Sequence, residues 1–371
     1  GERRGRRGGQ PPHFDWEAGL RLGASGRYVV DGLLGEGDAG RVLSCRDTKT
    51  GHTVAVKLAR DNRRQWRHAT AEAETLRRLE EVDAERCRRS LVRLLDTFVH
   101  EDGPSRHFCL VFEPLADSLR GVVQAAGGSG LLARDVQSAA RQLAGALAFL
   151  HSAGLAHTDV KCTNVMLRDA AFDVAPHPRL PPPCEVPVLR RPMEVVLIDF
   201  GCATTPPARL DPKVSRPDSR PGARHIRAPE VVLGLCWDCE ADVWSLGCTL
   251  ASLYMGARLF HVHTDMEHLA MMEHITETCI PVSMGLGVAP RIAEKGAFFD
   301  RTGRLEWPRR ASSEDAIDRV REAPTLRQAV LRRHGTFGEL LAGMLEIEPR
   351  SRLQAAALLR GSFLAGPEVS E

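Results

Sequence analysis

A glycine-rich loop between two β-prone runs is the feature that most constrains how this chain can fold. Gly35, Gly37 and Gly40 follow the spacing G-x-G-x-x-G-x-V, which ends on Val42. Rossmann-type proteins share the glycine spacing, but their loop opens a helix after a single strand. Because β-prone residues flank the present loop on both sides, we predict a hairpin within a β-rich lobe. Glycine allows such a backbone to turn tightly and to lie close over phosphate groups.

A lysine and a glutamate downstream of the loop form a second candidate pair. Lys57 ends the apolar run at residues 54–57, where its point charge suits a phosphate. Glu72 falls on the apolar face of the helix predicted next, where an unpaired carboxylate would be costly. We therefore predict that Lys57 and Glu72 are partners, the alternative being an ordinary lysine on an edge strand. The apolar residues of this helix face are Ala69, Ala73, Leu76 and Leu79.

After Pro114 the periodicity changes from mostly strand-like to mostly helical. The predicted fold class is α+β and bilobal, with a small β-rich lobe (27–114) that carries one main helix and a larger, mostly helical lobe (115–364). Residues 1–26 are expected to form a basic, disordered arm, because the arginines and glycines at its start cannot build a core. Residues 365–371 are expected to be a tail. The proline-rich stretches 173–192 and 206–221 are predicted to be long irregular loops.

Residues 157–164, His-Thr-Asp-Val-Lys-Cys-Thr-Asn, match the catalytic loop of protein kinases. In that motif Asp159 orients the acceptor hydroxyl and accepts its proton, Lys161 steadies the transferred phosphoryl group and Asn164 binds magnesium. A strand then leads into Asp-Phe-Gly, in which Asp199 is the main magnesium ligand. The motifs occur in the order found in protein kinases, whose catalysis rests on positioning and charge neutralisation.

Two further predictions concern structural residues of the larger lobe. Ala228-Pro229-Glu230 completes the motif series, and we predict that Glu230 is buried there with Arg352 as its bidentate partner. His157 is expected to be a packed scaffold residue rather than a base.

Several stretches resemble the LAMMER (Cdc-like, CLK-type) dual-specificity kinases of the CMGC group. The most specific is EHLAMMEHI at residues 267–275, which by itself predicts only an amphipathic helix. The resemblance covers about residues 27–364. It implies ATP- and Mg²⁺-dependent phosphorylation of Ser and Thr in Ser/Arg-rich splicing factors, tyrosine autophosphorylation, and an intracellular, nuclear setting. Other matching stretches are LHSAGLAHTDVK (150–161), DFGCAT (199–204), RHIRAPEVVLG (224–234), DVWSLGC (242–248) and GRLEWP (303–308).

The same resemblance implies that ATP binds in the cleft between the lobes. Phe112 would then be the gatekeeper, and the residues from Glu113 to Leu115 would be the hinge. Leu34, Val42, Ala55 and Met166 would enclose the adenine. The residues expected to contact ATP are Leu34, Gly35, Glu36, Gly37, Gly40, Val42, Ala55, Lys57, Phe112, Glu113, Leu115 and Met166.

The chain departs from the family pattern at Ala39, Cys162 and Ile226, where relatives carry Phe, Pro and Tyr. These changes loosen the glycine-rich loop and remove a tyrosine-dependent contact, but none removes a group needed for the chemistry. The family inserts a hairpin at 173–192, and here the prolines argue against a regular one, because proline cannot donate to a strand ladder. Phosphorylation control of the segment after Asp199 is one hypothesis and a passive loop the other; its candidate acceptors are Thr204, Thr205, Ser215 and Ser219.

Bulk properties set outer limits on the function. A net charge of +2 gives no support to nucleic-acid binding beyond a role for the basic arm. No apolar run is long enough for a membrane span, and ten scattered cysteines fit reduced intracellular thiols. The lone Cys236-x-x-Cys239 is a weak zinc signal. Two alternatives stay open: a kinase of a neighbouring, Dyrk-like group with other substrates, and a pseudokinase that binds nucleotide without catalysis.

Overall fold

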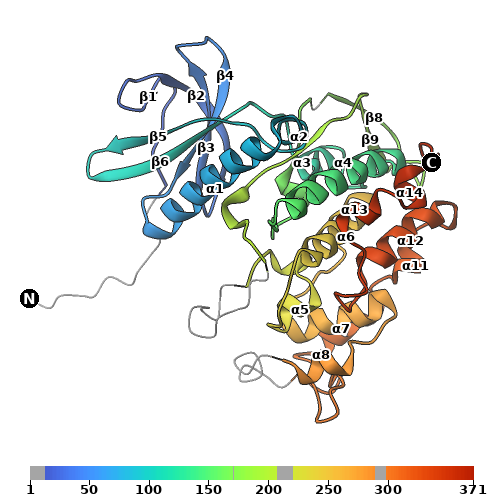
Figure 1. Cartoon of the computed structure of the whole chain (residues 1–371). Coiled ribbons are helices and arrows are strands. Elements are labelled where there is room, and N and C mark those ends of the chain that lie inside the picture. Colours follow the sequence, from blue (N-terminus) through green and yellow to red (C-terminus); the bar gives the residue numbers. More distant parts are fainter. Residues whose placement is uncertain (1–12, 170, 207–219, 289–297) are drawn as a thin grey trace, which may run out of the picture. The chain divides into compact units, whose positions relative to one another are not determined.

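The computed structural model describes residues 13–169, 171–206, 220–288 and 298–371, and it divides into two compact units, Gly1–Leu115 and Ala116–Glu371. The first unit is built on a six-stranded antiparallel sheet in the order β1-β2-β3-β4-β6-β5 (Figure 1). Its elements are β1 (Arg21–Leu22), β2 (Tyr28–Gly37), β3 (Gly40–Asp47), β4 (Thr53–Ala59), α1 (Arg63–Val82), α2 (Ala84–Ser90), β5 (Leu94–Asp102) and β6 (Ser105–Phe112).

The two faces of this sheet have different roles. Side chains directly opposite each other on paired strands point to the same face. Val42 lies opposite Lys57, and Ala55 lies opposite Phe112. Ala55 and Lys57 are two positions apart on β4, so all four side chains share one face. α1 packs on that face, where it brings Glu72 to Lys57. The other face builds the apolar core of the unit, from Leu43, Cys45, Val54, Val56, Leu58, Cys109 and Val111.

The prediction that residues 1–26 form a disordered arm is wrong for residues 13–26; residues 1–12 lie outside the described residues. Phe14 is buried in the core cluster, and Trp16 and Leu20 pack against it. Arg21 and Leu22 pair with β2 as strand β1. The prediction extended the disorder expected of the basic residues at the start of the chain to this apolar segment. The segment buries enough apolar surface to be held on the sheet.

α1 forms where the apolar spacing predicted a helix. Its N-cap is Asn62, whose side chain accepts a hydrogen bond from the Gln65 backbone N–H. The helix ends at Asp83, which in turn caps α2 by accepting from Arg86 N. The predicted stripe is confirmed, because the buried residues of α1 are Ala69, Glu72, Ala73, Leu76 and Leu79.

The second unit is mostly helical. α4 and α6 form its centre, and α6 is buried over most of its surface, as expected for a helix that is apolar all round. The elements are α3 (Leu119–Ala125), α4 (Ala133–Ser152), η1 (Cys162–Asn164), β7 (Val165–Leu167), β8 (Phe172–Pro176), β9 (Glu185–Leu189), β10 (Val195–Leu197), η2 (Phe200–Cys202), η3 (Arg224–Ile226), α5 (Pro229–Val232), α6 (Glu240–Met255), α7 (Asp265–Thr276), α8 (Val282–Leu286), α10 (Glu314–Glu322), α11 (Leu326–Ala329), η4 (Arg332–His334), α12 (Gly335–Met344), α13 (Ala355–Leu358) and α14 (Ser362–Ala365).

The proline-rich stretch 173–192 forms a regular hairpin, contrary to the prediction. β8 pairs with β9 in antiparallel register, and Pro176 and Pro187 both lie inside the strands. His177 N donates to Cys184 O at 2.9 Å, which makes this a hydrogen-bonded pair. Because hydrogen-bonded and non-bonded pairs alternate, both strand prolines fall in non-bonded pairs and no ladder bond is lost.

α7, which contains EHLAMMEHI, is buried on nearly every side rather than amphipathic. Its buried residues are Met266, Glu267, His268, Leu269, Ala270, Met271, Met272 and Ile275. The carboxylate of Glu267 is compensated by Arg319 Nε at 2.7 Å and by the His263 backbone N–H at 2.9 Å. In the described part of the chain, no helix has the length and apolar character needed to cross a bilayer.

Candidate active site

The predicted pair of Lys57 and Glu72 is present in the first unit. Lys57 Nζ lies 2.8 Å from Glu72 Oε2, and the glutamate is 2% exposed. β4 aims the lysine and α1 aims the glutamate, as the positions of these residues on strand and helix predicted. The pair fixes a cation on the sheet face that also carries Val42, Ala55 and Phe112.

The glycines of the loop between β2 and β3 serve different purposes. A Cβ at Gly40 would lie 1.9 Å from the Leu58 backbone oxygen, so the sheet itself requires glycine there. A Cβ at Gly35 or Gly37 would meet nothing within 4 Å, so packing within the chain does not require glycine at these positions. Leu34, beside them, is 57% exposed, which leaves its side chain available to a ligand.

This difference predicts unequal effects of two alanine substitutions. Gly40→Ala forces Cβ against the backbone of β4, and we expect a loss of about 3 kcal/mol in stability. Gly35→Ala, the matched control in the same loop, changes stability by less than about 0.5 kcal/mol. Thermal unfolding of the two variants beside the parent chain tests this, and equal midpoints would contradict the assignment.

In the second unit, Asp242 of α6 holds the backbone of the catalytic loop. Its two carboxylate oxygens accept the N–H groups of His157 and Thr158, both at 2.7 Å. Burial would raise the pKa of Asp242, but hydrogen bonds from His151 and the His157 backbone hold that pKa below its usual range. Asp242 was not among the predicted site residues. A signal was available, because Asp242 is a carboxylate at the start of the apolar helix pattern of α6. A buried carboxylate needs a compensating partner, which is how Glu72 was identified.

The side chain of Asp159 is oriented from three directions. Lys161 Nζ lies 2.6 Å from its Oδ2, Asn164 Nδ2 lies 3.2 Å from the same oxygen, and the Ala223 N–H reaches Oδ1 at 3.2 Å. His157 is buried, donates to Ile198 O at 3.0 Å and packs edge-on against Phe200. The structure therefore brings Asp159, Lys161 and Asn164 together, and places His157 in a scaffold position.

Backbone strain is concentrated in this region. Among the described residues, three other than glycine have positive φ, and two of them are Thr158 (71°) and Asp199 (67°). The left-handed region is costly for a β-branched residue. Thr158 is held there by Asp242 and by its own hydroxyl, which donates to Cys202 O at 3.0 Å. Such enforced geometry is typical of residues that must point at a ligand.

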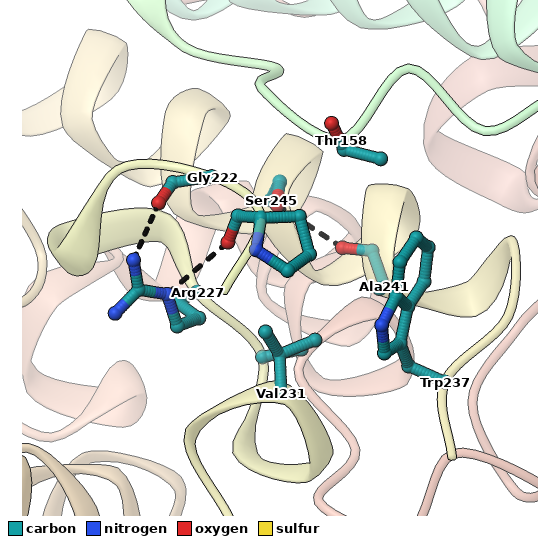
Figure 2. A pocket seen from close by; sticks show the side chains of 9 residues that line it. Thr158, Gly222, Arg227, Val231, Trp237, Ala241 and Ser245 are labelled. Carbon is teal, nitrogen blue, oxygen red and sulfur yellow. Dashed lines mark hydrogen bonds between the residues drawn. The ribbon is translucent and has the colours of Figure 1, made fainter. Parts of the chain in front are cut away.

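The segment from Arg220 to Ala228 is fixed next to the catalytic loop by its own arginines. Arg220 pairs with Asp265 at 2.7 Å. The guanidinium of Arg227 donates to backbone oxygens rather than to a carboxylate, to Pro221 O at 3.1 Å and to Gly222 O at 2.7 Å. Figure 2 shows the bond between Arg227 and Gly222. Burial and the neighbouring Arg220 lower the pKa of Arg227 to about 10. The small pocket beneath this turn is lined by Thr158, Pro221, Gly222, Arg227, Ala228, Val231, Trp237, Ala241 and Ser245.

The predicted buried pair of Glu230 and Arg352 is confirmed. Arg352 donates to both oxygens of Glu230, at 2.8 and 3.0 Å, and both side chains are fully buried. Ile226, which replaces a tyrosine of the family pattern, is buried, and its carbonyl accepts from Ser245. Of the candidate phosphorylation sites, Thr205 is exposed and Thr204 is half-buried, whereas Ser215 and Ser219 lie outside the described residues.

The residues of the second unit suit magnesium, and those of the first unit suit the phosphates of a nucleoside triphosphate. Asn164 uses its amide nitrogen on Asp159, which leaves the oxygen Oδ1 as the atom that could bind a cation. Asp199 adds a carboxylate, and oxygen donors are what Mg²⁺ prefers. In the first unit, the space above Gly35 and Gly37 and the cation of Lys57 suit phosphate groups.

Comparison with known proteins agrees with this chemistry. Residues 28–364 match the protein kinase domain family, and the chain belongs to that family. A solved crystal structure of a kinase domain superposes with a TM-score of 0.83 at 33% identity, covering 95% of this chain and 98% of that one.

Curated relatives identify the group within this family. The chain is 32% identical to the serine/threonine-protein kinase AFC1 of Arabidopsis thaliana, over 91% of this chain and 70% of the relative. It is 31% identical to the dual specificity protein kinase CLK1 of Homo sapiens, over 91% of this chain and 66% of the relative. It is a protein kinase of the LAMMER, or CLK-type, group, as the sequence resemblance predicted.

Proposed function

We propose that the chain transfers the γ-phosphoryl group of magnesium-bound ATP to Ser and Thr of proteins, with Asp159 as the base. The observation that carries this is the fixed carboxylate of Asp159, held by Lys161, Asn164 and the Ala223 N–H. Magnesium and ATP would supply the electrophilic phosphorus and neutralise its charge. Asp159 would orient the acceptor hydroxyl and receive its proton as the new oxygen–phosphorus bond forms.

The remaining residues would serve as binding groups. Lys57, steadied by Glu72, would hold the α- and β-phosphates, and Asn164 and Asp199 would hold magnesium. Lys161 would neutralise the phosphoryl group in transit. The sheet face that carries Val42, Ala55 and Phe112 would contact the adenine, together with Leu34, the hinge from Glu113 to Leu115, and Met166.

We further propose Ser/Arg-rich splicing factors as substrates and the nucleus as the setting. The support is the membership of the LAMMER group and the similarity to AFC1 and CLK1. The test offers labelled ATP and magnesium with an Arg-Ser repeat peptide, a matched Lys-Ser peptide and a proline-directed peptide. Labelling of the Arg-Ser peptide that requires magnesium and Asp159 supports the proposal. Labelling of the proline-directed peptide alone would reject the proposed substrate class but would still support protein kinase activity.

The burial of the tyrosines in this chain leads to a prediction about its autophosphorylation. The chain has two, Tyr28 and Tyr254, and both are buried, at 3% and 5% exposure. Tyr28 donates to Asp96 at 2.7 Å, and the Tyr254 hydroxyl bonds His334 at 2.8 Å. Contrary to the tyrosine autophosphorylation that the family resemblance implies, we expect the folded chain to autophosphorylate only on serine and threonine, because both of its tyrosines are buried. Phosphoamino-acid analysis after incubation with ATP checks this; phosphotyrosine in the folded protein would contradict it.

A further inference from the structure

The glycine-rich hairpin between β2 and β3 is contacted on its rear face by residues that precede β1. The face expected to bind nucleotide carries Val42, which lies opposite Lys57. Arg41 is the neighbouring residue on β3, so its side chain points to the opposite face, as does Leu43 of the apolar core. Glu36 lies opposite Arg41 in the register of β2 and β3 and points to the same face. Glu36 and Arg41 therefore lie on the rear of the hairpin.

Arg41 connects the hairpin to the segment before β1. Its Nε donates to Glu36 Oε2 at 2.7 Å, and its Nη1 donates to the backbone oxygen of Phe14 at 2.5 Å. The side chain of Arg41 is only 19% exposed, although it lies close to the tip of a hairpin. The hydrogen bond from Arg41 lowers the pKa of Glu36, so this carboxylate is ionised at neutral pH. Any contact of Glu36 with ATP would thus use its backbone.

His13 makes a second connection to the hairpin. Its Nε2 lies 3.4 Å from Glu36 Oε1 and also contacts the guanidinium of Arg60. Arg60 follows β4, and its backbone N–H donates to Ala39 O, at the tip of the hairpin, at 3.1 Å. The segment before β1 thus contacts both a strand of the hairpin and the residue that bonds its tip.

Phe14 anchors this segment in the core of the first unit. Its side chain is 5% exposed and packs edge-on against His100 and His107, with ring centroids 5.2 and 5.1 Å away. His107 is fixed in turn, because its Nδ1 donates to Ala59 O at 2.8 Å. The backbone oxygen of Phe14 is therefore a fixed point, and the hydrogen bond from Arg41 ties the hairpin to it.

The position of the hairpin depends on such contacts from outside it. A Cβ at Gly35 or Gly37 would meet nothing within 4 Å, and Asp38 at the tip is exposed. A loop that already occupies its binding position loses less conformational freedom when the ligand arrives, so it binds that ligand more tightly. Contacts that fix the hairpin from the rear therefore affect nucleotide affinity without touching the nucleotide.

We propose that residues 13–16, which we call the brace, hold the glycine-rich hairpin in position for the nucleotide, with Arg41 and Glu36 as positioning residues. The inference rests on the proposed binding of ATP at this hairpin and identifies residues that control its affinity from a distance. The brace lies before residues 28–364, the part of the chain that matches the protein kinase domain family.

Arg41→Met tests the proposal, because it keeps the length of the side chain and removes both of its donors. We expect the Kd for a non-hydrolysable ATP analogue with magnesium to rise about fivefold. The kcat at saturating ATP should stay within about twofold of the parent value, because the lost contact does not involve the reacting atoms. Amide hydrogen exchange over residues 33–42 should become faster without nucleotide. Arg46→Met, which changes an exposed arginine of the same strand, is the matched control and should keep the parent values.

A second substitution asks whether the brace acts through Arg41. Phe14→Ala removes the anchor of the segment and should raise the Kd by a similar factor. Adding Arg41→Met to Phe14→Ala should then have little further effect, because both changes break the same connection. Since Phe14→Ala also leaves a cavity in the core, thermal unfolding of each variant establishes that it is folded at the assay temperature.

The outcomes separate this inference from the proposed function. Equal Kd values for Arg41→Met and Arg46→Met would overturn the brace, even if Arg41→Met lowered the thermal midpoint, because Arg41 would then be purely structural. Fully additive effects of Phe14→Ala and Arg41→Met would overturn it as well. Binding and hydrogen exchange require no phosphoryl transfer. A parent chain that binds the analogue but phosphorylates no peptide would therefore reject the proposed function, and the binding data would still decide on the brace.

Discussion

We expect the variant Asp159→Asn to keep the fold of the parent chain and to transfer phosphate about 10³-fold more slowly. An amide still accepts the N–H of Ala223 through its oxygen, so the loop geometry survives. The amide cannot take the proton of the acceptor hydroxyl, and it removes the charge that faces Lys161 at 2.6 Å. The affinity for magnesium-ATP is expected to change little, because Asp159 is assigned to the acceptor hydroxyl rather than to the nucleotide.

Steady-state transfer to the preferred peptide measures this effect, with thermal unfolding as a check on the fold. Asp102→Asn, at the exposed end of β5, is the matched control and should keep full activity. If Asp159→Asn stayed within tenfold of the parent rate, Asp159 would not be the base. A contaminating kinase is excluded when the residual rate per amount of variant is the same in independent preparations.

Local patterns in the sequence were sufficient to predict a contact where the helical or strand period shows which side chains face the core. The helical spacing of Ala69, Ala73 and Leu76 put Glu72 toward the sheet, and a buried carboxylate must find a cation, so Lys57 could be named. Glu230 was predicted to be buried from its place in the Ala-Pro-Glu motif, and its predicted partner Arg352 is confirmed. Asp242 satisfied the same criterion, but its partners are backbone N–H groups at residues 157 and 158, which no side-chain pattern reveals.

Predictions failed where the outcome depends on register or on tertiary packing. The prolines at 176 and 187 looked incompatible with a hairpin, yet only the pairing register shows that both fall in non-bonded pairs. The polar residues of EHLAMMEHI suggested an exposed face, whereas Arg319, distant in sequence, allows Glu267 to be buried. The segment before β1 is ordered because Phe14 packs into the apolar core on the sheet, a tertiary contact that the local sequence does not reveal.

The second large effect concerns the stability of the larger unit. Arg352 and Glu230 are 0% and 1% exposed, and Arg352 also donates to the backbone oxygens of Glu240 and Glu346, both at 2.9 Å. Arg352→Met would leave a buried carboxylate and these carbonyls without their donor. We expect a loss of about 3–5 kcal/mol in the free energy of unfolding, with a large fall in the thermal midpoint.

A matched substitution shows that burial, rather than pairing as such, sets this cost. Arg321 pairs with Asp318 at 2.5 Å on the exposed face of α10, and Arg321→Met should cost less than about 0.5 kcal/mol. The double variant Glu230→Met/Arg352→Met removes the stranded charge, so it should be less destabilised than Arg352→Met alone. Equal midpoints for Arg352→Met and Arg321→Met would show that the buried pair does not stabilise the fold, and its role would then have to be sought in positioning α5 beside the segment that contacts Asp159.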